Sequence, residues 1–134
     1  MRPDKFTEQA QEAIGLSQQI VRRYQHSQWD VEHIFLALLE QKKGLTGDIL
    51  RKLKINVDDV RDRVDSALQK SPRAASEGTI MYGTPRTVRL LDNAETEADR
   101  MKDEFIGSEH LLIALFNVRD GETPKIMEEF GLGQ

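Results

Sequence analysis

The chain has 134 residues, enough for one compact domain or for two small units that share one core, and its 38% hydrophobic and 31% charged residues are typical of a folded protein. Its net charge of −4 gives no overall attraction to nucleic acid or anionic membranes, and the absence of cysteine excludes disulfides, thiol chemistry and cysteine-ligated metals. The N-terminal residues form no apolar signal segment, and no run approaches the roughly 20 apolar residues that span a bilayer. We therefore expect a cytoplasmic protein with neither nucleic acid nor membrane as a partner.

An internal duplication organises the chain. The pair Glu32-His33, which opens a dense apolar segment, recurs as Glu109-His110, 77 residues later. The same offset aligns further identical residues without a gap: Thr7 with Thr84, Arg23 with Arg100, Ala37 with Ala114, Gly44 with Gly121 and Thr46 with Thr123. Self-similarity at a fixed spacing indicates two copies of one structural unit.

The first copy is predicted to contain four helices. Apolar residues at three- and four-residue steps predict a helix that starts after Thr7. Residues 31–41 predict a second helix, apolar around most of its circumference and therefore central. A third helix over 46–54 and a fourth over 58–70 follow, separated by the polar cap Asn56-Val57-Asp58.

The second copy follows a linker over residues 71–83, which carry Pro, Ser and Gly without a sustained period. Thr84-Pro85 supplies a side-chain N-cap and a residue well tolerated at the first helical position. Helices are then predicted over 84–102, 108–118 and 123–130. The chain ends where the first copy begins its fourth helix, so we expect it to be a piece of a longer protein.

The predicted fold class is therefore all-α, with essentially no sheet. Two four-helix repeats, residues 1–70 and 84–134, are related by a pseudo-two-fold axis and pack into one domain, the second repeat lacking its last helix. The two most apolar segments, 31–41 and 108–118, belong at the middle of a shared core, where each buried Leu or Phe contributes roughly 1.5–3 kcal/mol.

The sequence gives little support for an enzymatic activity or a metal site. The chain has no P-loop, and three histidines without cysteine leave little material for a catalytic grouping, so we expect no catalytic residue. Adjacent residues on a helix project about 100° apart, so Glu32 and His33 are badly placed to hold one ion, and we expect no metal site. His33 and His110 are predicted to be structural, each ring bonded across the turn between helices.

Two interpretations of Glu32 and Glu109 remain open. A carboxylate in the first helical turn complements the helix dipole, worth about 0.3–1 kcal/mol. Alternatively, the two residues form a pseudo-symmetric pair of exposed acidic positions that receive guanidinium groups. Thr7 and Thr84 likewise act as N-caps or mark helix starts that bind anions. A helix start paired with a carboxylate would hold a ligand that has an anionic and a cationic end.

Several segments together resemble a known family. These are KFTEQAQEAI, EQKKGLTGDILRKLKI, YGTPRTVRLLDNAETEA and FIGSEHLLIAL, with the Glu-His pair opening an apolar helix in both copies. From about residue 4 to the end, the chain is similar to the double-repeat N-terminal domain of Clp-type AAA+ unfoldases, closest to ClpC and ClpB.

This resemblance implies a domain that binds adaptor proteins and unfolded or tagged substrates, in front of ATPase modules that would use ATP and Mg. The segment itself is expected to be monomeric and free of cofactor, the parent hexameric, with ClpP as a partner through the parent. In ClpC-like members the domain also recognises phosphoarginine. By position, Glu32 and Glu109 would meet the guanidinium, with Thr7-Glu8 and Thr84-Pro85 facing the phosphate.

The sequence departs from the family pattern at several positions. Val31 and Ser108 stand where ClpC-type members commonly have Thr, and Asp30 is a candidate cap whose charge would repel a phosphate, so we favour the site at Glu109. Polar Asn93 and Glu97 argue against the apolar groove that ClpB-type relatives use for unfolded chains. The alternative function is a stand-alone double-repeat scaffold that docks on a Clp machine as an accessory subunit.

Overall fold

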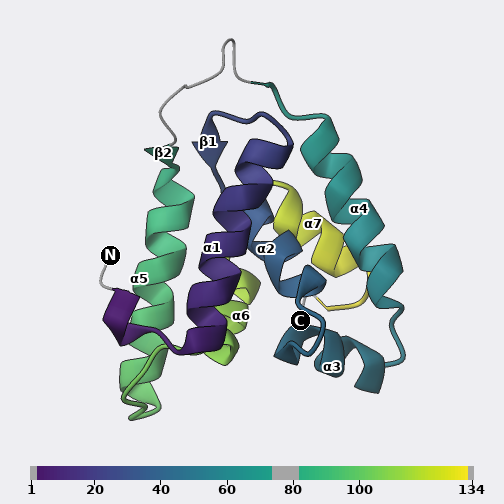
Figure 1. The fold of residues 1–134 in the computed structure, drawn as a ribbon. Helices are drawn as coiled ribbons and strands as arrows, with labels where there is room; N and C mark the ends of the chain where they lie inside the picture. Colours follow the sequence, from purple (N-terminus) through teal and green to yellow (C-terminus); the bar gives the residue numbers. More distant parts are fainter. Residues whose placement is uncertain (1–2, 74–81, 133–134) are drawn as a thin grey trace.

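The computed structural model describes residues 3–73 and 82–132, and within these ranges the chain forms seven α-helices (Figure 1). The first repeat contains the short 3-10 helix η1 (Pro3–Lys5) and the helices α1 (Glu8–Arg23), α2 (Val31–Glu40), α3 (Leu45–Lys52) and α4 (Val57–Gln69). The second contains α5 (Pro85–Arg100), α6 (Ser108–Phe116) and α7 (Glu122–Glu129). The all-α prediction is confirmed, and each predicted helix end lies within about two residues of the observed one. No helix in the described ranges is long and apolar enough to cross a membrane.

The helix starts follow from side-chain caps. Thr7 Oγ1 accepts a hydrogen bond from the amide of Ala10, and Thr84 Oγ1 accepts one from the amide of Thr87, three residues into each helix. Asn56 Oδ1 does the same for α4. Such caps satisfy amides that have no partner inside the helix, so the predicted starts of these three helices rest on local chemistry.

Two short backbone ladders join the repeats crosswise. The strands β1 (Gln28–Trp29) and β2 (Tyr82–Gly83) pair in parallel, and a bridge joins Phe6 to Ile106. The bridge links the segment before α1 to the segment before α6. The β1–β2 pair links the segment before α5 to the segment before α2. The expectation of essentially no sheet overlooked these ladders, and Tyr82–Gly83 is strand rather than linker; the predicted linker residues 74–81 lie outside the described ranges.

The core is centred on α2 and α6, which lie behind α1 in Figure 1. Nine of the ten α2 residues are buried, and α6 is buried along most of its length, as the sequence predicts. Among the largest fully buried side chains of these two helices are Ile34, Phe35, Leu36 and Leu38 from α2 and Leu111 and Leu115 from α6. Because the other helices pack around these two, the repeats share one core.

Candidate functional site

Two groups of side chains related by the pseudo-symmetry, called here the first and second pockets, lie where the start of α1 or α5 meets the start of the other repeat's buried helix. The first pocket is formed by Asp30, Glu32, Thr84, Arg86 and Thr123, and the second by the equivalent residues Gly107, Glu109, Thr7, Gln9 and Thr46. Matching backbone bonds hold them, from the Thr84 amide to the Trp29 carbonyl at 3.0 Å and from the Thr7 amide to the Ile106 carbonyl at 2.9 Å. The structure therefore places the turn before the Glu32 helix beside Thr84, and the turn before the Glu109 helix beside Thr7.

In the first pocket Glu32 is buried and fully bonded within the protein. Only 6% of the residue is exposed, which corrects the expectation that it lies open at a helix start. Its Oε2 accepts hydrogen bonds from the amide of Thr123 at 3.0 Å and from the Thr123 hydroxyl at 2.7 Å, and its Oε1 accepts one from Arg86 Nη2 at 3.2 Å. Glu32 thus caps the first turn of α7 from another repeat.

Asp30 completes the first pocket. Its Oδ1 accepts hydrogen bonds from the Val31 amide at 2.8 Å and the Thr84 hydroxyl at 3.0 Å, and its Oδ2 accepts one from Arg86 Nη2 at 2.6 Å. The prediction that Asp30 caps this helix is confirmed. Pro85 is exposed, and its nitrogen carries no hydrogen to donate. The first pocket is therefore an internal ion cluster, whose cation is Arg86.

The second pocket differs from the first in the exposure and contacts of its glutamate. The Glu109 side chain is 53% exposed, and the nearest charged or titratable partner of its Oε1 is His110 Nδ1 at 4.0 Å. No lysine or arginine within residues 3–73 and 82–132 pairs with it at 4.0 Å or less. Thr46 Oγ1 and Ser108 Oγ are buried with no hydrogen-bond partner among the described residues. Glu8 is exposed in the first turn of α1.

The histidines that follow the two glutamates are structural, as predicted. His33 is 2% exposed and His110 1%. The Nδ1 of each ring accepts a hydrogen bond from the amide three residues earlier, Asp30 at 2.9 Å and Gly107 at 2.8 Å. Each ring therefore fixes the turn into its helix. Burial lowers the pKa of His33 to about 4, and the neighbouring His26 acts in the same direction.

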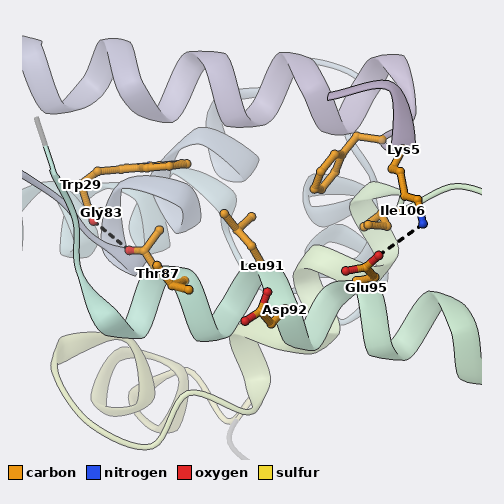
Figure 2. Close-up of a pocket in the computed structure, with 10 residues that line it drawn as sticks. Lys5, Trp29, Gly83, Thr87, Leu91, Asp92, Glu95 and Ile106 are labelled. Atoms are coloured by element: carbon orange, nitrogen blue, oxygen red, sulfur yellow. Dashed lines mark hydrogen bonds and ion pairs between the residues drawn. The ribbon is translucent and has the colours of Figure 1, made fainter. Parts of the chain in front are cut away.

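A groove lies beside the two ladders, between η1 with the start of α1 and the exposed face of α5 (Figure 2). It has a volume of about 460 Å³. Its apolar lining comprises Phe6, Trp29, Val88, Leu91 and Ile106, and its polar lining comprises Lys5, Thr87, Asp92 and Glu95. The α5 residues form adjacent pairs that recur at three- and four-residue steps, at positions 87, 88, 91, 92 and 95, so they share one helical face.

The contacts around the groove fix its shape. Thr87 Oγ1 donates to the Trp29 carbonyl at 2.8 Å, and Trp29 Nε1 donates to Ser17 Oγ at 2.9 Å, so the indole is held at one end. Lys5 Nζ and Glu95 Oε2 lie 3.5 Å apart at the other end, as the dashed line in Figure 2 shows. Val88 is 52% exposed, so this apolar side chain is accessible to a partner.

This groove corrects a prediction, because Asn93 and Glu97 do not line it. Asn93 borders a separate hollow with Arg86, and Glu97 forms an ion pair with Arg100. The apolar residues of α5 are visible in the sequence as one face. Their exposure depends on how far η1 lies from α5, which the periodicity of a single helix does not determine.

Comparisons with known proteins agree with this architecture. A family model described as the Clp repeat (R) N-terminal domain matches residues 5–130. Chaperone protein ClpB 2 of Nostoc sp. is 36% identical over 132 residues, which are 98% of this chain and 15% of that protein. The Hsp104 N-terminal domain from Candida albicans has the same fold, with a TM-score of 0.85 at 20% identity over 96% of this chain and 83% of that one.

A second solved structure is the ClpV N-domain in complex with a VipB peptide. It matches with a TM-score of 0.74 at 17% identity, over 96% of this chain and 80% of that one. At these identities the two structures establish the fold, whereas the family model establishes the family. The doubled helical unit, its shared core and these matches agree: the chain belongs to the Clp repeat N-terminal domain family, and it spans 15% of the length of its Nostoc relative.

Proposed function

We propose that the chain is the substrate- and adaptor-recognition domain of an ATP-dependent Clp unfoldase, and that it binds partner polypeptides in the groove along α5. The observation that carries this proposal is the groove itself, which leaves Val88 and Leu91 accessible beside the indole of Trp29. The peptide bound by the structurally similar ClpV N-domain supports a binding role for this fold. In this proposal ATP hydrolysis belongs to other modules of a hexameric cytoplasmic parent, with ClpP as its downstream partner.

The chemistry of the groove suits one kind of segment. Its floor is apolar, and its α5 rim carries the carboxylates of Asp92 and Glu95 against the single ammonium of Lys5. Asp92 forms no ion pair with any described residue. An extended segment that presents an apolar side chain next to a basic one matches this lining.

Trp29 reports on the groove directly, because it is the only tryptophan in the chain. A short tryptophan-free peptide with leucine next to lysine should change the Trp29 fluorescence saturably. Val88→Ser should weaken binding about tenfold, since burying a valine contributes roughly 1.5 kcal/mol. The matched control is Leu53→Ser, because Leu53 is 55% exposed and does not line the groove. Equal affinity of the two variants would exclude the groove as the binding site.

A second candidate function is recognition of phosphoarginine, or of another guanidinium group, at Glu109. The exposed Glu109 carboxylate has no cationic partner among the described residues, and α1, a helix of 16 residues, starts beside it. A helix start attracts anions, although Glu8 in the first turn opposes a phosphate. The first pocket also has a helix start, that of α5, but its Glu32 is buried and paired with Arg86, and Asp30 adds a negative charge.

Calorimetric titration with phosphoarginine tests this second function. Glu109→Gln should remove the binding heat, because it removes the charge that pairs with the guanidinium. Glu104→Gln, an exposed position in the segment before α6, should bind like the unsubstituted protein. If Glu109→Gln binds phosphoarginine with unchanged affinity, the ligand does not use this pocket.

A further inference from the structure

A hollow lies on another flank of α5, away from the groove. It has a volume of about 220 Å³ and lies between α5 and the turn that joins α6 to α7. Adjacent residues of a helix project about 100° apart, so Val88 lines the groove while Arg89 lines this hollow. We call it the basic hollow, and its lining residues are Arg86, Arg89, Leu90 and Asn93 of α5 and Asn117, Val118, Arg119 and Asp120 of the turn.

Two arginines and two asparagines supply the available hydrogen-bond donors of the basic hollow. Arg89 and Arg119 are exposed, and neither forms an ion pair with a residue in the described ranges. The side chains of Asn93 and Asn117 are also exposed, and they have no hydrogen-bond partner among the same residues. A carboxylate accepts hydrogen bonds from guanidinium and amide N–H groups. The four side chains around one hollow therefore suit a carboxylate ligand.

The third arginine of the basic hollow, Arg86, is already paired inside the protein. Its Nη2 donates to Asp30 Oδ2 at 2.6 Å and to Glu32 Oε1 at 3.2 Å. Asp120 is the one carboxylate of the lining; its side chain is 69% exposed, and its Oδ1 lies 3.6 Å from Arg86 Nη1. Asp120 therefore opposes an anionic ligand, and the two unpaired arginines favour one.

The equivalent hollow of the first repeat carries carboxylates at the matching positions. It lies between α1 and the end of α2, with a volume of about 730 Å³. Glu12 stands at the position of Arg89, and Glu40 stands at that of Asn117. Glu12 accepts a hydrogen bond at 3.0 Å from the glutamine that follows α2, and Glu40 pairs at 2.7 Å with an arginine of α1. The first repeat thus has bonded carboxylates where the second has unpaired donors.

We propose that the basic hollow binds a carboxylate side chain of the same partner polypeptide whose apolar and basic side chains occupy the groove. The path from Val88 to Arg89 around α5 is about 10 Å, which about three extended residues cover. The partner segment therefore carries an acidic residue about three residues away from its apolar and basic pair. Since the chain has a net charge of −4, it offers acidic segments no general attraction, and the contact is local. This inference rests on the proposed function of the groove and adds a second contact to it.

Two peptides that differ only in their tails test this proposal. Both carry the tryptophan-free leucine-lysine core and a spacer of three glycines, followed by two glutamates in one peptide and two glutamines in the other. Both termini are blocked, and each tail is tried at either end of the core. Trp29 fluorescence reports binding, because Trp29 lines the groove. In low salt the better glutamate peptide should bind about three- to fivefold more tightly than its glutamine counterpart, as expected for exposed ion pairs. Salt at about 0.5 M should remove the difference by screening.

Substitutions assign the gain in affinity to the basic hollow. Arg89→Gln together with Arg119→Gln should abolish the gain, whereas Asp120→Asn should increase it by removing the opposing carboxylate. Arg22→Gln together with Lys52→Gln is the matched control, because it removes the same charge from exposed positions outside the hollow. The control should leave the gain unchanged. All five side chains are exposed, so folding should be preserved.

The outcomes separate this inference from the function on which it rests. If the peptides bind with equal affinity, or if the gain persists without the two arginines of the hollow, the basic hollow does not bind the partner. If neither peptide changes the Trp29 fluorescence of the unsubstituted protein, the groove itself is refuted as a binding site, and this inference is refuted with it.

Discussion

The two repeats differ at single residues that face their equivalent histidines. His110 Nε2 lies 2.8 Å from Asp103 Oδ2, whereas His33 Nε2 lies 2.8 Å from His26 Nδ1. His26 and Asp103 are equivalent positions in the repeat. Because Nδ1 of His33 accepts from a backbone amide, its Nε2 carries the proton and donates to His26. A proton added to either ring of the first repeat would place two donors against each other.

This arrangement predicts that stability falls on acidification. Below pH 6.5 the unfolded chain takes up a proton at His33, but the folded chain does so only near its pKa of about 4. The free energy of unfolding should therefore decrease by about 3 kcal/mol as the pH falls through this window, at about 1.4 kcal/mol per pKa unit. Burial also lowers the pKa of His26, which acts in the same direction.

His26→Asp provides the matched comparison, because it gives His33 the carboxylate that His110 has. The charge of the carboxylate should favour protonated His33, so the variant should lose about 2 kcal/mol less than the unsubstituted protein between pH 7 and pH 4.5. Urea unfolding at both pH values measures this difference. Equal losses would show that the histidine pair does not control the acid response.

At the scale of helices, the two short helices α3 and α7 start in different ways. Neither has a side-chain cap of its own, since Gly44 and Gly121 occupy the N-cap positions. The α7 start is capped by Glu32 from α2, whereas Glu109 folds back over Gly107 and does not cap α3. The same residue type at equivalent positions therefore stabilises a helix in one repeat and is available to a ligand in the other.

This difference predicts unequal effects of one substitution. Glu32→Ala leaves Arg86 with fewer partners and Thr123 uncapped, so it should destabilise the domain by about 3–5 kcal/mol. Glu109→Ala should change stability by less than about 0.5 kcal/mol, because its side chain is half exposed. Urea unfolding of the two variants at pH 7 measures these changes in the free energy of unfolding. Comparable decreases for the two variants would contradict the assignment of Glu32 as a tertiary cap.

At the scale of the molecule, the sequence predicts the helices because hydrophobic period and caps are local properties. Each cap, at Thr7, Asn56 or Thr84, accepts a hydrogen bond from an amide three residues later. The 77-residue offset between the repeats is enough to predict the pseudo-symmetry. Burial of Glu32 is not predictable in this way, because it depends on α5 and α7, whose Arg86 and Thr123 lie far away in sequence.

The groove, too, depends on residues that lie far apart in the sequence. The apolar face of α5 is readable from the sequence, but the groove also needs Phe6, Trp29 and Ile106, which the crosswise ladders bring to it. Two-residue strands are too short to produce an alternating pattern. The second repeat's Glu109 stays a prediction as a ligand contact, supported by its exposure and awaiting titration.

The crosswise ladders also determine when the domain can form during synthesis. The amide of Thr7 pairs with the carbonyl of Ile106, so this tertiary contact forms only with a partner made about 100 residues later. A ribosome releases the chain N-terminus first, at about 5–20 residues per second. The first repeat therefore emerges with its contacts to α6 and α7 unmade, exposing the apolar α2. A protein whose family relatives are named chaperones would itself depend on protection until its second half has left the ribosome.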